Sequence, residues 1–109
     1  MAITTMVHGD VLVATVEDSR IDAAGAVAFK DAMVKLKSEP QARVVLDLAQ
    51  VDFLDSSGLG AVVSVMKAYG ADKTLELASL SPIVEKVLRL TRMDKVFRIH
   101  GSADQALAA

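Results

Sequence analysis

The chain of 109 residues has no cysteine and no tryptophan, and these absences already exclude several classes of protein. Without thiols it cannot use a cysteine nucleophile, a disulfide framework or a thiolate metal site. Acidic and basic residues nearly balance at a formal charge of −2 and are interspersed, so no basic patch indicates nucleic-acid binding. We therefore expect a protein or a small molecule as the partner, and no nucleic acid.

The chain also lacks an apolar run near the roughly 20 residues that span a bilayer. Its hydrophobic fraction of 52% is high, but alanine supplies much of it and aromatic residues supply only 4%. The N-terminus lacks the basic start and apolar core of a secretory signal. We predict one cytoplasmic domain over residues 1–109, without a membrane partner and large enough for a single core.

Alternating β-prone and helical segments predict an α/β fold. Residues 3–7 and 11–16 flank His8-Gly9-Asp10, where glycine can adopt the positive φ of a hairpin turn, so these two strands should pair antiparallel. Further strands are expected at 43–48, 74–78 and 96–99. Helices are expected at 23–37, from the Asp55-Ser56-Ser57 stretch to about 69, from 82, and from a cap at 102 through 109. The order is β-β-α-β-α-β-α-β-α. Each strand-helix-strand step implies a parallel neighbour, so the central sheet should be mixed.

The most distinctive stretch is Val51-Asp52-Phe53-Leu54-Asp55-Ser56-Ser57-Gly58-Leu59-Gly60. It follows a strand expected to be buried on both faces and begins a helix with an expected apolar face of Leu59, Val62, Val63 and Met66. Any one of Asp55, Ser56 and Ser57 could cap this helix by accepting a hydrogen bond from a first-turn amide. One cap needs only one side chain, so capping does not explain all three.

Asp22 should lie on the same rim of the sheet as these residues. Parallel sheets collect their functional loops at the carboxyl ends of the strands. Asp22 follows the second strand, where it is also placed to cap the first helix, and Asp55-Ser56-Ser57 follows the third strand. We expect both groups to emerge side by side.

The sequence does not favour an enzyme. His8 and His100 lack both the spacing of a two-histidine metal helix and a surrounding carboxylate cluster, so we interpret both as surface histidines and expect no metal or cofactor. Ser56 or Ser57 could stand at a nucleophile turn, but the flanks do not match G-x-S-x-G and no histidine base can be assigned. Gly58-Leu59-Gly60 is too short for a dinucleotide fingerprint.

What remains is a serine that receives a modification. The free amides and positive dipole of a helix N-terminus tolerate a phosphate without unfolding the helix. The phosphate adds roughly −1.5 to −2 charge beside Asp55 and Asp22. A docked partner would have to desolvate this charge next to like charges, and a penalty of ~3 kcal/mol would weaken binding by roughly 100-fold or more.

Phe53-Leu54-Asp55-Ser56-Ser57-Gly58-Leu59-Gly60, after the strand Val44-Val45-Leu46-Asp47-Leu48, resembles the signature of STAS domains and in particular of bacterial anti-sigma factor antagonists. The similarity extends over most of the chain and includes Ile21-Asp22 and Ser81-Pro82. It implies the STAS fold, with helices packed mainly on one face of a mixed sheet. The sequence departs from the family near Asp22, where Ser19 replaces a usual glycine and Gly25 replaces a usual threonine or serine.

The resemblance also implies a mechanism. The unmodified protein would bind an anti-sigma factor that is also an ATP-dependent serine kinase, and so free the sigma factor. Phosphorylation of Ser56 would end this binding and a serine phosphatase would restore it. The resemblance places Asp22, Asp55, Ser57, Gly58 and Leu59 on the partner surface.

Alternatives from another class stay open at this point. A STAS domain could instead be a subunit of a transporter complex or carry a small ligand, with the serines acting only as helix caps. The choice of Ser56 over Ser57 rests on the resemblance, since both would lie in the first helical turn. The sequence leaves the oligomeric state open.

Overall fold

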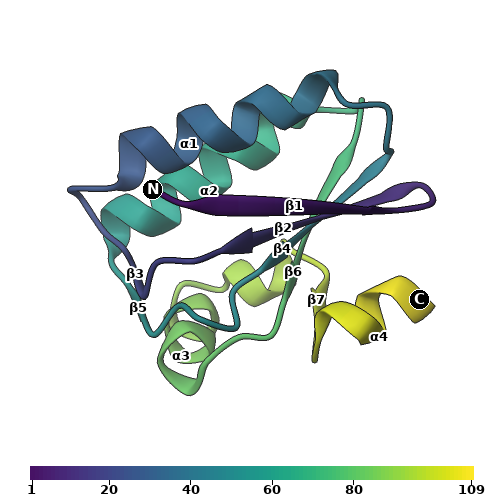
Figure 1. The fold of residues 1–109 in the computed structure, drawn as a ribbon. Coiled ribbons are helices and arrows are strands. Elements are labelled where there is room, and N and C mark those ends of the chain that lie inside the picture. The colour runs from purple at the N-terminus through teal and green to yellow at the C-terminus, as the bar shows by residue number, and fades with distance from the viewer.

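The computed structural model describes all residues from 1 to 109 and contains a mixed five-stranded sheet with four helices (Figure 1). The strands are β1 (Ile3–His8), β2 (Val11–Val16), β4 (Arg43–Asp47), β6 (Thr74–Ala78) and β7 (Ile99–His100). They lie in the order β1-β2-β4-β6-β7, with β1 antiparallel to β2 and every other pair parallel. The predicted mixed α/β sheet is confirmed. A separate parallel pair, β3 (Arg20–Ile21) and β5 (Phe53–Leu54), was not expected.

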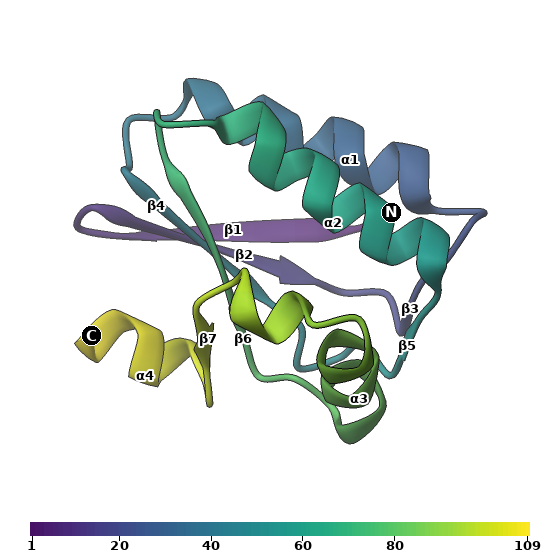
Figure 2. The same cartoon turned by 180° about the vertical axis from the view of Figure 1, so that it is seen from behind.

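The helices divide between the two faces of the sheet. Helices α1 (Ala26–Val34) and α2 (Ser56–Tyr69) lie side by side over one face, and α1 continues into the 3₁₀ turn η1 (Lys35–Ser38) (Figure 1). Helix α3 (Pro82–Leu90) and the 3₁₀ turn η2 (Met93–Lys95) contribute to the same core. The short helix α4 (Ala103–Ala108) lies on the opposite face, as both views show (Figure 2). The helices therefore pack mainly on one face, as expected.

The central strands are buried on both sides. Val44 and Leu46 of β4 face the larger core, while Val45 faces the smaller cluster under α4, and all three are fully buried. Strand β2 has the same two-sided pattern. The near-continuous β-branched runs predicted this arrangement because a strand covered on both faces has no polar side.

Three helix ends match their sequence signals. Ser81 Oγ accepts from the Val84 amide at 3.4 Å, with Pro82 at the first helical position of α3. Ser102 Oγ accepts from the Gln105 amide at 3.0 Å and caps α4. Helix α2 ends at Gly70, whose φ of 56° is open to glycine without strain.

Helix α1 begins later than predicted, and Asp22 does not cap it. The helix starts at Ala26, three residues beyond the predicted start. Asp22 instead closes a turn ahead of the helix, because its Oδ1 accepts from the Gly25 amide at 3.3 Å and its carbonyl oxygen accepts from the same amide at 3.0 Å.

The last strand and His100 were also wrongly placed by the sequence. The strand was expected at 96–99 but occupies Ile99–His100, because η2 precedes it and the Phe97 amide donates to the Met93 carbonyl. His100 was expected at the surface, yet its side chain is only 8% exposed and its Nε2 lies 2.7 Å from Glu76 Oε1. A buried carboxylate on the neighbouring strand gives the imidazole a partner inside the protein.

Glu76 also binds Arg43, so three strands share one buried polar network. Arg43 Nη2 donates to Glu76 Oε1 at 2.7 Å and Nε donates to Oε2 at 2.8 Å. Arg43 Nη2 further donates to the Ala106 carbonyl at 3.0 Å, which ties α4 to the sheet. The Arg43 hydrogen bonds lower the pKa of Glu76 to about 2, with a smaller contribution from His100.

Candidate functional site

The β3–β5 pair brings the two predicted acidic loops together. Ile21 stands opposite Leu54 in this pair, and the Asp55 amide donates to the Ile21 carbonyl at 3.4 Å. Asp55 Oδ2 then accepts from the Ala23 amide at 3.2 Å, across 32 residues of sequence. The expected proximity of Asp22 and Asp55 on one rim is confirmed. Its cause is the pairing of β3 with β5, and these strands of two residues each are too short to be predicted from the sequence.

Asp55 is the residue that caps α2. Its backbone is extended, and its Oδ1 accepts from the Gly58 amide at 2.8 Å. Ser56 and Ser57 are exposed, and neither hydroxyl makes a hydrogen bond within the chain. The alternative that the serines serve only as caps is therefore wrong, because the carboxylate already fills that role.

Gly58 differs from its neighbours in being buried. A Cβ at this position would collide with the Ile21 carbonyl oxygen and lie 2.8 Å from Leu54 Cδ1. The missing side chain lets the first turn of α2 press against β3 and β5. Gly58 therefore sets the position of Ser56 and Ser57, and it does not itself present a surface to a partner.

Helix α2 is rotated relative to its predicted apolar face. Its buried residues are Gly58, Ala61, Val62, Val65 and Tyr69. Of the predicted stripe, only Val62 is buried, and Leu59, Val63 and Met66 are half-buried. Small residues at 58 and 61 allow the close approach to the sheet, which turns Leu59 and Val63 towards α3.

This rotation creates an apolar groove between α2 and α3. The groove has a volume of about 620 Å³ and begins at Asp55 and Ser56. Leu59 and Val63 line one wall, and Val87 of α3 lines the other. The sequence did not predict the groove, because Leu59 and Val63 fit the apolar stripe expected to face the core.

Asp22 and Asp55 form an acidic rim, which Arg20 and Phe53 support. The sequence did not predict this role of Arg20 and Phe53. The Arg20 guanidinium lies 3.9 Å from the centre of the Phe53 ring, and its Nε donates to Asp22 Oδ2 at 3.1 Å. The Arg20 hydrogen bond, together with amides of the following turn, holds the pKa of Asp22 below its usual value. Asp22 is therefore ionised at neutral pH and held next to Asp55.

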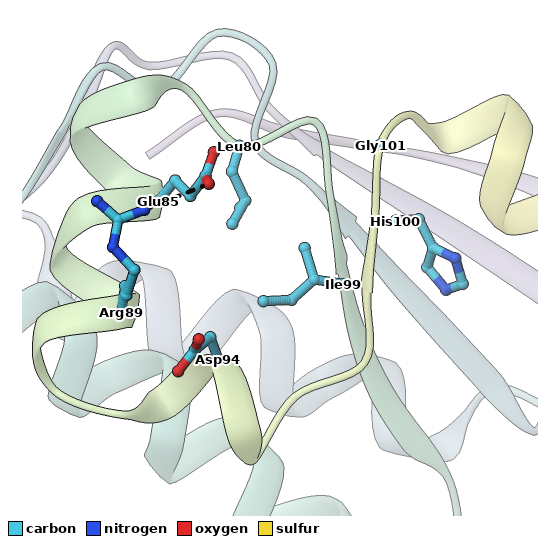
Figure 3. A pocket seen from close by; sticks show the side chains of 7 residues that line it. All are labelled: Leu80, Glu85, Arg89, Asp94, Ile99, His100 and Gly101. Carbon is cyan, nitrogen blue, oxygen red and sulfur yellow. Dashed lines mark ion pairs between the residues drawn. The ribbon is translucent and has the colours of Figure 1, made fainter.

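A second cavity, of about 430 Å³, lies between α3 and β7. Figure 3 shows Glu85, Arg89 and Asp94 on one side of it, with Arg89 paired to Glu85 at 3.6 Å. The His100 ring lies on the other side of the β7 ribbon from these charges (Figure 3). The arrangement brings no base to a nucleophile.

Comparison with known proteins identifies the family. Residues 2–106 match the family described as the STAS domain. The chain belongs to the STAS family. No helix in the structure combines the length and apolar character that crossing a bilayer requires.

The relatives of this STAS domain include anti-sigma factor antagonists. A STAS-domain containing protein of Pseudomonas aeruginosa is 33% identical over 101 residues, covering 91% of this chain and 99% of the relative. The anti-sigma-F factor antagonist RsfB of Mycobacterium tuberculosis is 24% identical over 107 residues, covering 98% and 87%. A crystal structure of an anti-sigma factor antagonist from Mycobacterium paratuberculosis superimposes with a TM-score of 0.87 at 26% identity, covering 98% and 91%. The Mycobacterium tuberculosis and Mycobacterium paratuberculosis proteins are named as antagonists, in agreement with the expectation that this chain is not an enzyme.

Two more distant structures share the fold alone. The Bacillus cell fate determinant SpoIIAA in its phosphorylated form has a TM-score of 0.71 at 18% identity, covering 98% of this chain and 97% of that one. A sulfate transporter family protein from Wolinella succinogenes has a TM-score of 0.80 at 18% identity, covering 94% and 86%. The STAS fold therefore occurs in both kinds of protein that the sequence left open.

Proposed function

We propose that this STAS domain is an anti-sigma factor antagonist switched by phosphorylation of Ser56. The unmodified protein binds an anti-sigma factor that is also a serine kinase, and this binding frees the sigma factor. The observation that carries the proposal is the Ser56 hydroxyl, which is exposed and free of hydrogen bonds at the start of α2. A hydroxyl that is exposed and free of hydrogen bonds is accessible to a kinase. Its phosphorylation breaks no hydrogen bond that stabilises the fold.

The proposed docking surface joins the acidic rim to the groove. Asp55 and Ser57 flank Ser56 in the chain, and Asp22 directly precedes the Ala23 amide that Asp55 binds. Leu59 lines the groove that begins beside Ser56. An apolar side chain of the partner placed in the groove would bring the partner's surface over Ser56. The docked kinase would then reach Ser56, and the phosphorylated surface would no longer bind it.

The proposed switch is electrostatic. A phosphate on Ser56 adds roughly −1.5 to −2 charge next to the carboxylates of Asp55 and Asp22. First-turn amides of α2 have no intrahelical acceptor and can receive hydrogen bonds from the phosphate, so the helix persists. The partner, however, would have to desolvate the dianion beside two carboxylates. A serine phosphatase would reset the switch, and the ATP-dependent cycle would run in the cytoplasm.

Phosphorylation and binding assays with the cognate kinase test this proposal. Incubation with the kinase and ATP should label the parent chain and Ser57→Ala but not Ser56→Ala. The charge mimic Ser56→Asp should weaken the complex by roughly 100-fold or more. Its circular dichroism spectrum should match that of the parent, because the hydroxyl that is replaced makes no hydrogen bond within the chain.

Ser38→Asp is the matched control, since it adds the same charge to an exposed serine at the end of η1. It should bind the kinase as the parent does. If Ser56→Asp binds as tightly as Ser38→Asp, a phosphate at Ser56 is not the switch. If the chain co-purifies from its native cells with a transporter and with no ATP-binding kinase, the transporter-subunit alternative replaces the proposal.

A further inference from the structure

Strand β1 forms one edge of the central sheet and has a neighbour on one side only. It is six residues long, whereas the opposite edge, β7, has two. Figure 1 shows β1 in front of the other strands, with no segment drawn across its outer side. The backbone groups on that side have no partner in the chain.

The register identifies the outward-facing groups. Residues in β1 and β2 pair so that Ile3 stands opposite Val16 and His8 opposite Val11. The Glu17 amide donates to the Ala2 carbonyl at 2.9 Å, which makes Ala2 part of a hydrogen-bonded pair. Hydrogen-bonded and non-hydrogen-bonded pairs alternate along an antiparallel ladder. The amides and carbonyls of Ile3, Thr5 and Val7 therefore point away from β2.

This edge lacks the features that usually prevent strands from pairing. Exposed edges are commonly protected by charged residues, proline or a bulge. Residues 1–7 contain no charged side chain and no proline, and the β1–β2 register runs without a bulge. Met6 and Val7 are 61% and 56% exposed. The edge is regular, uncharged and partly apolar.

We propose that two copies of this chain associate through β1, antiparallel, with Thr5 opposite Thr5 of the second copy. This register places Ile3 opposite Val7 on both sides of the twofold axis. Each of the three pairs can exchange two hydrogen bonds, roughly six in all, and the two sheets become continuous. A second copy suits the edge because an uncharged strand meets itself without like-charge repulsion.

The pairing leaves the Ser56 surface free. The residues that line the groove lie on β5, α2, α3, η2 and the adjoining loops, and β1 contributes none of them. Dimerisation and the proposed switch can therefore succeed or fail independently.

Cysteine cross-linking tests the register directly, because the chain has no native cysteine. In the proposed dimer the two Thr5 Cα atoms lie ~5.5 Å apart, within the range of a disulfide. Two His8 residues, offset by six positions, lie about 20 Å apart. Mild oxidation should convert Thr5→Cys largely into a covalent species of twice 11.5 kDa, while the His8→Cys control, whose position is also exposed, should form no covalent dimer.

Light scattering at rising protein concentration gives the second test. Thr5→Pro removes an outward amide and none that bonds to β2, so it should keep the parent's circular dichroism spectrum and lose the dimer. Thr5→Val keeps the amide and should dimerise as the parent does. A parent that stays monomeric at every concentration overturns the proposal, as does equal cross-linking of the two cysteine variants. A dimer unaffected by Thr5→Pro would use another surface and also overturns it.

Discussion

Two glycines in α2 should respond in opposite directions to the same substitution. Gly58 and Gly60 both lie inside the helix, where alanine is favoured over glycine by roughly 0.8–1 kcal/mol. At Gly60 a Cβ meets no atom within 4 Å, so Gly60→Ala should gain most of that difference. At Gly58 a Cβ collides with the Ile21 carbonyl oxygen, which belongs to the backbone and cannot rotate away.

The size of the Gly58→Ala effect follows from the collision. Forcing extra volume into a packed site costs typically 1–3 kcal/mol, and a fixed backbone obstacle belongs at the upper end of that range. After the helix-propensity gain, a net loss of about 2 kcal/mol remains. This loss should lower the midpoint of thermal unfolding by about 8–16 °C, and Gly60→Ala should raise it by about 3–8 °C.

Urea denaturation followed by circular dichroism would measure both variants against the parent. An unchanged slope with a shifted midpoint would assign the effect to stability, not to a change in the unfolded state. If Gly58→Ala is as stable as the parent, the close approach of α2 to β3 is absent in solution. If both variants lose stability equally, glycine is required at positions 58 and 60 for flexibility of the helix start and not for packing.

Two further predictions concern buried polar groups. The pKa of Glu76 is lowered to about 2 from 4.5, so its ionised form contributes stability that is fully present above pH 4.5 and is lost as the pH falls through about 2. Glu76→Gln should therefore remove this acid dependence and cost about 3 kcal/mol at neutral pH by leaving Arg43 without its carboxylate, as denaturation at several pH values would reveal. Burial raises the pKa of Tyr69 to about 12, so stability present below pH 10 should be lost as the pH rises from 10 through 12. As the chain's single tyrosine, Tyr69 should ionise near pH 12 in the folded protein and near pH 10 in urea by ultraviolet absorbance, and equal values in both would contradict its burial.

Local signals predicted most of the secondary structure because they act within a few residues. The caps at Ser81 and Ser102 and the end of α2 at Gly70 depend on hydrogen bonds or φ values that the nearby sequence fixes. The buried centre of β4 was equally predictable, since no residue from Val44 to Leu46 is polar. For the site, the sequence placed Asp22 and Asp55 on one rim from strand order alone.

The errors arose where packing over long distances decides the outcome. The predicted face of α2 is only partly the buried one. Val62 is buried and Leu59, Val63 and Met66 pack against the core while half-buried, whereas the small residues Gly58 and Ala61 are buried. His100 was misplaced because its partner, Glu76, lies 24 residues earlier on β6. The sequence did contain a signal for a buried partner of Glu76. This residue stands between Leu75 and Leu77 in a buried strand, and a buried carboxylate needs a buried cation or hydrogen-bond donor.

The capping role of Asp55 explains how the proposed switch could act on binding alone. If Ser56 itself accepted the first-turn amide, phosphorylation would compete with a cap that contributes about 1 kcal/mol to stability. Asp55 instead accepts from the Gly58 amide and, with its second oxygen, from the Ala23 amide. The carboxylate thus fixes both the helix start and the neighbouring loop, and the Ser56 hydroxyl takes no part in either. A modification at a group that supports nothing in the fold changes only the surface presented to a partner.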